Sequence, residues 1–281
     1  MANDINLKNY FLVVAVLISF AGVGCRKEKN IDEPSPGGGS PGTKTALLKQ
    51  IIQDKLPSPA YHFYYDKRNQ VSRIELSSGL FSYDVLYDGL KVNRLENKKH
   101  QSGLKYLYEN NRIRCIQKFS GMEETVSAAY YLDYHFNGLL KNINYFEYGN
   151  NKTDSLLSRT FSLMYHDDGN LASVEEKRIA ENGTLQFSKA MMYGEYDEGK
   201  NMEGTGILRD FFDELLYLPE MTLQKNNPAV VKMAIAGGKF LIRNHFQYDG
   251  KIPVLKMSKM TQTGGTGMGD SFTFMTRYTY Y

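Results

Sequence analysis

The sequence predicts an all-β protein: an antiparallel β-meander of repeated hairpins, curled into an open or closed barrel-like sheet. Apolar and polar residues alternate with a period of two in many short segments, such as Phe81, Tyr83, Val85 and Tyr87, which is typical of half-buried strands. Composition agrees, because the chain has 21 tyrosines and 15 phenylalanines, both of which favour strands. We expect about 12 to 16 strands from roughly residue 60 to residue 281.

A short repeat supplies the turns between these strands. Each unit has a tyrosine, then usually an acidic residue or a histidine, then a turn containing Gly or Asn, then an aliphatic residue. The repeat tyrosines are Tyr65, Tyr87, Tyr108, Tyr134, Tyr165, Tyr196 and Tyr248. Asn-Gly and Asp-Gly adopt the positive φ angles that tight hairpin turns require. The spacing suits one hairpin per unit, although scattered turns in an ordinary β-sandwich are an alternative.

The first 24 residues predict a secretory signal peptide. Lys8 precedes an apolar run over residues 10–21, which is shorter than the roughly 20 residues of a membrane-spanning helix. Small residues at Gly22 and Gly24, directly before Cys25, resemble a bacterial lipobox. The resemblance implies cleavage before Cys25 and a lipid on its thiol. We therefore expect a lipid anchor in the outer membrane. The sequence does not distinguish its periplasmic side from its surface side.

Residues 25–43 predict a flexible tether, because the segment 34–42 is made of Pro, Ser and Gly and cannot pack a core. The following residues 44–281 are expected to form one β-rich domain. At its start, residues 45–55 place Leu48, Ile51 and Ile52 at helical spacing, which predicts a short N-terminal helix.

One helical insertion is expected near residues 204–236, where the gap between repeat tyrosines is longest. Leu208, Phe212 and Leu215 lie on one face at helical spacing. Asn227-Pro228 predicts a second helix start, with a cap followed by proline at the first helical position. We expect the insertion to pack on the sheet through Leu208, Phe212 and Leu215.

The repeat resembles the Tyr-Asp units of RHS-type proteins, which build long curled antiparallel sheets. The whole arrangement is similar to an uncharacterised family of Bacteroidetes lipoproteins, a domain of unknown function with a porin-like fold. The shared features are the lipobox, the Gly/Pro tether, the spaced Tyr-Asp hairpins, the late insertion and the aromatic C-terminus at residues 277–281. The resemblance implies an envelope location and brings no catalytic residue, because the family has no established activity.

Each motif that could indicate catalysis, metal binding or a cofactor is better explained as an ordinary structural feature. The glycine-rich residues 264–269 are followed at once by a strand, so they predict a hairpin loop rather than a phosphate-binding loop. Residues 167–170 predict a turn, since the further oxygen ligands of a Ca²⁺ loop are missing. If Cys25 carries a lipid, Cys115 is unpaired, and we expect it to be a buried small side chain on the face of Ile113. We expect no catalytic residue, no metal and no cofactor.

The leading functional hypothesis is a lipid-anchored envelope protein with a non-catalytic binding or structural role. The expected ligand surface is the concave or inner face bearing Tyr83, Tyr106, Tyr134 and Tyr165, although these tyrosines could equally pack the sheet. The sequence allows two classes of ligand, a glycan or an envelope protein. Nucleic acid is not expected, because the net charge is only +3 and the charges are mixed along the chain.

Two other functions remain as alternatives. The first is an integral outer-membrane β-barrel, which the alternating strands and abundant aromatic residues allow. Alternate residues back from Tyr281 share one face of the last strand. They are Thr279, Arg277, Met275 and Thr273, which would make a poor lipid-facing surface. The second is an envelope hydrolase whose site is brought together only by the fold and is not visible in the sequence.

Overall fold

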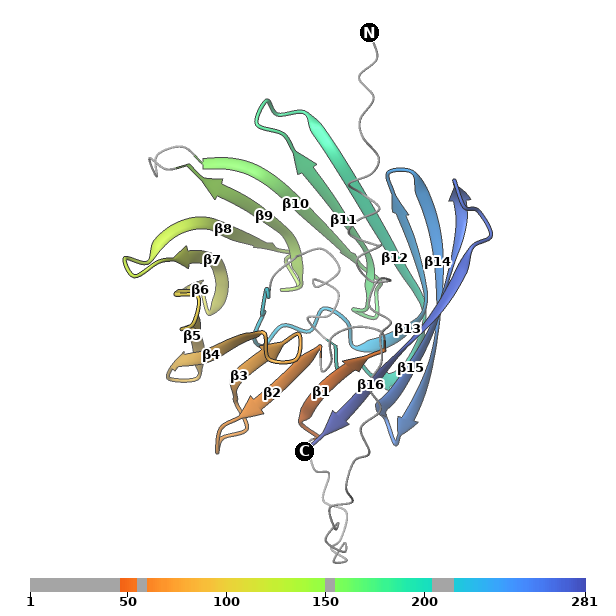
Figure 1. The fold of residues 1–281 in the computed structure, drawn as a ribbon, viewed down its shortest axis with the longest axis horizontal. Coiled ribbons are helices and arrows are strands. Elements are labelled where there is room, and N and C mark those ends of the chain that lie inside the picture. The colour runs from red at the N-terminus through yellow and green to blue at the C-terminus, as the bar shows by residue number, and fades with distance from the viewer. Residues whose placement is uncertain (1–45, 55–59, 150–154, 204–214) are drawn as a thin grey trace, which may run out of the picture. The chain divides into compact units, whose positions relative to one another are not determined.

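The protein is a closed antiparallel β-barrel. The computed structural model describes residues 46–54, 60–149, 155–203 and 215–281. Sixteen strands each pair with their neighbours along the chain, and β1 pairs with β16 to close the ring (Figure 1). The predicted all-β meander is confirmed in its closed form. The predicted signal peptide, Cys25 and the tether lie outside the described residues.

The strands follow one another around the ring without a crossover. Their bounds are β1 Leu48–Gln53, β2 Tyr61–Tyr65, β3 Val71–Leu76, β4 Phe81–Asp88, β5 Lys91–Asn97, β6 Ser102–Glu109, β7 Arg112–Ser120, β8 Thr125–Tyr134, β9 Leu140–Tyr148, β10 Ser155–Tyr165, β11 Leu171–Ile179, β12 Leu185–Lys200, β13 Asn226–Ile235, β14 Gly238–Asp249, β15 Ile252–Gly265 and β16 Ser271–Tyr280. Every pairing of the ring lies within Leu47–Tyr281, which is a compact unit in its own right. Residues 44–281 therefore contain the complete folding unit.

Alternate residues of each strand face the lumen, and these residues form the hydrophobic core. On β8, Tyr130 and Leu132 are fully buried in the core, whereas the intervening Tyr131 lies on the outer wall. The same alternation places Ile74, Leu95 and Ile143 inside, each with no exposed area. Burial of apolar area at about 25 cal/mol per Å² is the main force that holds such a lumen closed.

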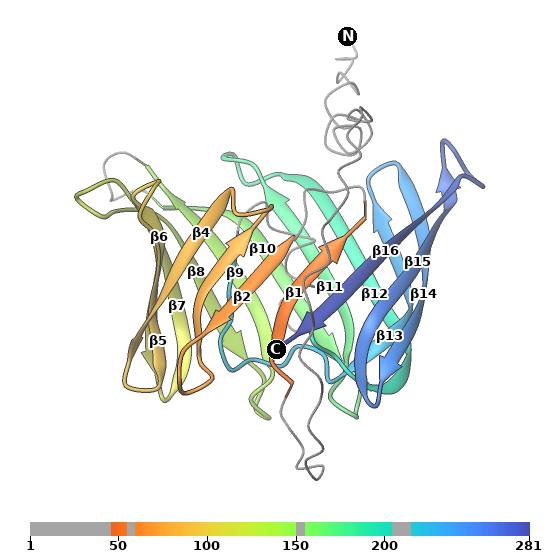
Figure 2. The same ribbon diagram turned by 60° about the horizontal axis from the view of Figure 1, so that its bottom comes forward.

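The segment 215–225 crosses the lumen between β12 and β13. Figure 2 shows this cyan segment running across the lower end of the barrel. Leu215, Leu218 and Leu223 are buried in the same core as the strand residues, as predicted for Leu215. The segment has no helix, residues 204–214 lie outside the described residues, and the expected second helix at Asn227-Pro228 is instead the strand β13. Tertiary pairing of residues 226–235 with β12 and β14 overrides the local capping signal.

Residues 48–53, within the range expected to be helical, form the strand β1. A β-bulge between Leu48 and Gln50 explains the misleading pattern. The extra residue puts Leu48 and Ile51 on the same face although they are three positions apart, and that spacing also fits one face of a helix. Among the residues that the structure describes, no helix is long and apolar enough to cross a bilayer.

The repeat tyrosines form a belt at one end of the barrel. Each lies at or near the end of an even-numbered strand, and Tyr280 of β16 continues the series. Six hydroxyls donate to a backbone carbonyl of the preceding hairpin, at 2.5–2.9 Å. The donor and acceptor pairs are Tyr65 to Leu48, Tyr87 to Val71, Tyr108 to Val92, Tyr134 to Ile113, Tyr196 to Leu171 and Tyr280 to Pro253. In each case the accepting residue is the cross-strand partner of the previous tyrosine, so each of these six bonds ties one hairpin to the next.

The predicted turn chemistry is present in six of the seven repeat units. Gly138 and Gly169 have φ angles of 89° and 82°, which only glycine adopts without strain, and Asn69, Gly89, Asn111 and Gly250 also have positive φ. The exception is the unit after Tyr196. There β12 continues to Lys200, and Gly199 is packed against the ring of Tyr248. Gly199 therefore provides space for a tyrosine of the belt rather than a turn.

Replacing Tyr108 by Phe should lower the free energy of unfolding by about 1–2 kcal/mol, because the Val92 carbonyl loses its hydroxyl donor. Tyr165 is a matched control at the same place in the repeat, since its hydroxyl is buried and has no hydrogen-bond partner among the described residues. Tyr165→Phe should therefore leave stability unchanged or raise it. Equal losses for the two variants in urea denaturation would contradict the role of the belt.

The belt also predicts alkaline unfolding. Burial raises the pKa of Tyr65, Tyr87, Tyr108 and Tyr134 to about 12 each, from an ordinary value near 10. The unfolded chain loses these protons first, so stability is full below about pH 10 and is lost as the pH rises towards 12. Circular dichroism across this range should show cooperative loss of the sheet. Titration of all tyrosines near pH 10 with the sheet intact would refute the prediction.

Candidate functional site

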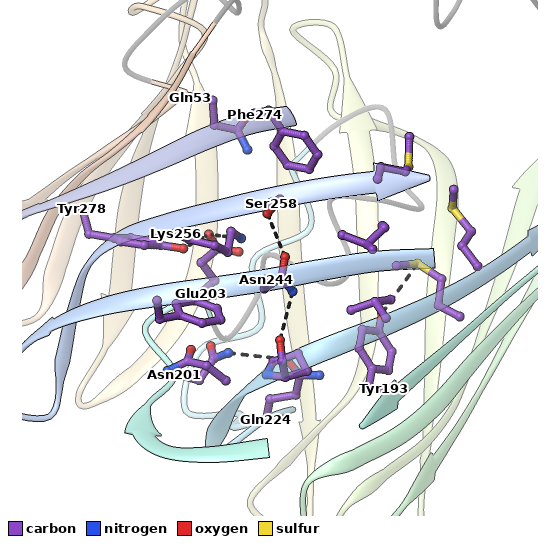
Figure 3. A pocket seen from close by; sticks show the side chains of 18 of the residues that line it. Gln53, Tyr193, Asn201, Glu203, Gln224, Asn244, Lys256, Ser258, Phe274 and Tyr278 are labelled. Carbon is purple, nitrogen blue, oxygen red and sulfur yellow. Dashed lines mark hydrogen bonds and ion pairs between the residues drawn. The ribbon is translucent and has the colours of Figure 1, made fainter. Parts of the chain in front are cut away.

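A cavity of about 300 Å³ lies in the lumen against strands β12–β16 (Figure 3). One part of its wall is apolar. Alternation along the strands directs Met191 of β12, Met233 of β13, Ile242 of β14 and Met260 of β15 into this part, with Phe274 of β16 beside them. Methionine side chains are flexible and polarisable, so this wall can adapt to apolar ligands of different shape.

The other end of the cavity is polar, and its centre is an ion pair. The Lys256 ammonium lies 3.0 Å from Oε1 of Glu203, and the two side chains are only 14% and 15% exposed. The Tyr278 hydroxyl donates to the same oxygen at 2.5 Å. Glu203 belongs to the segment that follows β12, so this pair joins the insertion to β15 and β16.

Amide side chains continue the polar end. The Ser258 hydroxyl donates to Oδ1 of Asn244 at 2.7 Å, and Nδ2 of Asn244 donates to the Pro228 carbonyl at 2.9 Å. Asn201 is different, because its Oδ1 is buried and has no hydrogen-bond partner among the described residues. A buried carbonyl oxygen without a donor is unfavourable, so Asn201 offers an acceptor to a ligand that carries a hydroxyl or an N–H group.

The chemistry of the cavity is that of a binding site. Lys256, Glu203 and Tyr278 bind one another and lie beside no described nucleophile of the Ser-His or Cys-His kind. Within the described ranges, no three His, Cys, Asp or Glu side chains come together as a metal site. The cavity combines an apolar wall with a few convergent polar groups, which is the usual composition of a small-molecule site.

A second cavity of about 560 Å³ lies in the opposite half of the lumen. Tyr83, Tyr130 and Tyr145 line it together with Lys118 and Arg159, from strands β4, β7, β8, β9 and β10. Leu215 of the crossing segment completes the wall. The described lining of this second cavity contains no carboxylate, whereas Glu203 offsets one of the two lysines of the first cavity.

The four tyrosines predicted as a ligand surface all face the lumen, but they do not converge on one cavity. Tyr83 lines the second cavity. Tyr106 is 3% exposed, and its hydroxyl donates to the Tyr217 carbonyl at 2.7 Å, so it anchors the crossing segment. Tyr134 and Tyr165 belong to the belt. The binding role of these four residues stays a prediction.

Cys115 is buried as expected, but it does not share the face of Ile113. A bulge in the pairing of β6 with β7 leaves one extra residue between them, so Cys115 lies opposite Leu107 and Tyr131 of the outer wall. Burial raises the pKa of its thiol to about 11, so the thiol stays protonated and unreactive near neutral pH.

Sequence reasoning missed the residues of the first cavity. Asn201 and Glu203 lie between β12 and the predicted insertion, and Gln224 lies within that insertion, where no motif marks it. Lys256 comes from β15, farther along the chain. The available signal in the sequence was the alternation of β14 and β15. It places the polar residues Asn244, Lys256 and Ser258 on the inward face, among apolar residues.

Comparisons with known proteins support the barrel. No protein-family model matches the chain, and no curated protein matches it. A crystal structure of a porin-like protein from Bacteroides vulgatus aligns with a TM-score of 0.57 and 13% identity, covering 84% of this chain and 99% of that one. A porin-like protein from Bacteroides uniformis aligns with a TM-score of 0.51 and 11% identity, covering 85% and 99%. At these identities the likeness shows a porin-like fold, which is the architecture of the outer-membrane barrel alternative.

The ion pair of the cavity can be tested through stability. Lys256→Met should lower the free energy of unfolding by about 2 kcal/mol, because Glu203 then lacks its cation. This value lies between the cost of breaking an exposed ion pair and that of breaking a fully buried one. Adding Glu203→Gln should recover much of this loss. Lys259→Met is the control, since Lys259 is exposed on the outer wall of the same strand and should cost less than about 0.5 kcal/mol. Equal costs for Lys256 and Lys259 would contradict the assigned pair.

Proposed function

We propose that this chain is a lipid-anchored, water-exposed barrel of the outer membrane that binds a small amphiphilic ligand in its lumen. The observation that carries the proposal is the polarity of the two sides of the wall. A membrane-spanning barrel presents apolar residues outwards and polar residues inwards. Here the lumen holds the apolar core, and charged residues such as Asp84, Glu175 and Lys177 share the outer positions with apolar ones such as Leu86 and Met192.

Ion pairs on the outer wall support this view. Arg73 of β3 lies 3.1 Å from Asp84 of β4. Lys177 and Glu175 of β11 are 3.3 Å apart, on the far side of the ring. At the centre of a bilayer each Arg or Lys on the lipid face would cost about 2–4 kcal/mol. Such a wall is therefore compatible with water.

The first cavity supports a binding role. Its volume of about 300 Å³ lies at the lower end of the range for small-molecule sites. The methionine-rich wall suits an apolar moiety, and the free acceptor of Asn201 suits a hydroxyl or N–H group. We infer an amphiphile with at least one hydrogen-bond donor, with its apolar part against Met233 and Ile242. Glycolipids and glycans with an apolar substituent belong to this class.

Membrane attachment would then come from the lipobox cysteine. The small residues before Cys25 and the Pro/Gly/Ser tether after it fit a lipid anchor that holds a folded body clear of the headgroups. Nothing in this arrangement requires the strands themselves to enter the bilayer.

A membrane-spanning barrel is the second candidate, and the porin-like neighbours favour it. Extraction separates the two candidates. If the proposal is correct, a Cys25→Ala chain should appear in the soluble envelope fraction, while the unsubstituted chain should stay with membranes until detergent is added. Retention of Cys25→Ala in membranes after alkaline carbonate extraction would overturn the anchored-barrel proposal and establish the second candidate.

Ligand binding can be tested with a neutral fluorescent naphthylamine, which is apolar and carries one N–H donor. Ile242→Trp should fill the cavity and weaken binding at least tenfold, because Ile242 lines its wall. Leu241→Trp is the matched control: Leu241 precedes Ile242 on β14 and faces outwards, so binding should be unchanged. Equal binding by both variants, with equal melting temperatures, would exclude this cavity as the site.

A further inference from the structure

The outer wall of β13–β16 carries an unbalanced set of positive charges. Its exposed basic residues, which together we name the cationic face, are Lys232, Lys239, Arg243, Lys259 and Arg277. These four strands contain a single carboxylate, Asp249, at the last position of β14. Because the strands are adjacent in the ring, the five cations share one continuous stretch of wall.

The register places two of these charges directly opposite each other. Arg243 of β14 lies directly opposite Lys259 of β15. Like charges directly opposite each other destabilise a sheet. None of the five cations has an ion pair with any described residue, whereas Arg73, Arg114 and Lys177 elsewhere on the outer wall each have a carboxylate within 4 Å. The cationic face therefore carries a local cost that an external anion would remove.

A hollow of about 550 Å³ lies within the cationic face. Arg243, His245 and Lys259 line it, together with Met257 and Met275. Asp54, after the end of β1, is its one carboxylate. The hollow thus combines a positive potential with apolar side chains between the cations, which suits a phosphate group attached to an apolar molecule.

We propose that the cationic face docks on an anionic membrane surface and binds its lipid phosphates. This inference rests on the proposed function, because it requires the outer wall to face water rather than span the bilayer. Lys and Arg near an anionic bilayer each strengthen binding about fivefold, so five of them give substantial attraction. Met257 and Met275 can enter the headgroup region between the cations. A lipid anchor alone leaves a tethered barrel free to rotate, whereas the cationic face would give it one orientation.

A membrane is favoured over a soluble acidic polymer for two reasons. The face is broad, since it spans four neighbouring strands, and its apolar residues would gain from the headgroup region but not from a hydrated polysaccharide. Its exposed positions also lack the stacked aromatic rings with which proteins bind single-stranded nucleic acid.

The test uses residues 44–281, which contain the whole barrel, and sedimentation with vesicles. One set of vesicles is pure phosphatidylcholine, and the other contains one-quarter phosphatidylglycerol. We expect binding only to the anionic set. The triple variant Lys232→Gln, Arg243→Gln and Lys259→Gln should reduce that binding about a hundredfold. The control variant Arg73→Gln, Arg114→Gln and Lys177→Gln removes the same charge from elsewhere on the outer wall, and should reduce binding less than about fivefold.

Several outcomes would overturn the inference. These are equal losses for the two triple variants, no binding of the unsubstituted barrel to anionic vesicles, or tighter binding to soluble polygalacturonate than to the vesicles. If the cationic-face variant unfolds, a salt titration of the unsubstituted barrel serves as the test instead. Screening by salt should abolish its binding to anionic vesicles. Carbonate-resistant insertion into both vesicle types would instead indicate failure of the water-exposed barrel itself, which is a distinguishable result.

Discussion

Closure of the ring is the constraint on which the rest of the structure depends. The pairing of β1 with β16 removes both edges of the sheet, so every strand residue must face either the lumen or the outside. Each hairpin contains a bulge near its tyrosine, which leaves one residue of the ladder unpaired and bends the strand. The tyrosine-to-carbonyl hydrogen bonds of the belt fix these bulges against the preceding hairpin. The same residues thus supply the curvature of the ring and hold its register.

The closed ring also makes the lumen the place of the main hydrophobic core. The crossing segment 215–225 fills part of it, and the cavities remain where polar side chains interrupt the apolar packing. Because the lumen holds the core, the outer wall is free to be charged. This inversion relative to a membrane barrel links the fold to the proposed anchored, water-exposed state, although the porin-like neighbours share the same ring.

Strands β14 and β15 carry both proposed activities, one on each side. Lys256 and Ser258 face the cavity, while Met257 and Lys259 between and beside them face outwards. A charge placed at an inward position is paired, as Lys256 is with Glu203, because an isolated buried charge is too costly. A charge placed at an outward position needs no partner in water. Lys256 and Lys259, three positions apart on β15, therefore take opposite roles because they face opposite sides of the wall.

The local chemistry of the barrel can be predicted from short stretches of the sequence. Alternation predicted the strands, Gly138 and Gly169 predicted their turns, and the tyrosine repeat predicted one hairpin per unit, because these features act over a few residues. Features that depend on pairing between strands far apart in the sequence are visible only in the folded barrel. It showed that Leu48–Gln53 is the closing strand, that Asn226–Ile235 pairs with β12 rather than starting a helix, and that Glu203 meets Lys256. It also gathered the five cations, which lie mixed with other residues along the chain, onto one face, because register across strands is not encoded in any single segment.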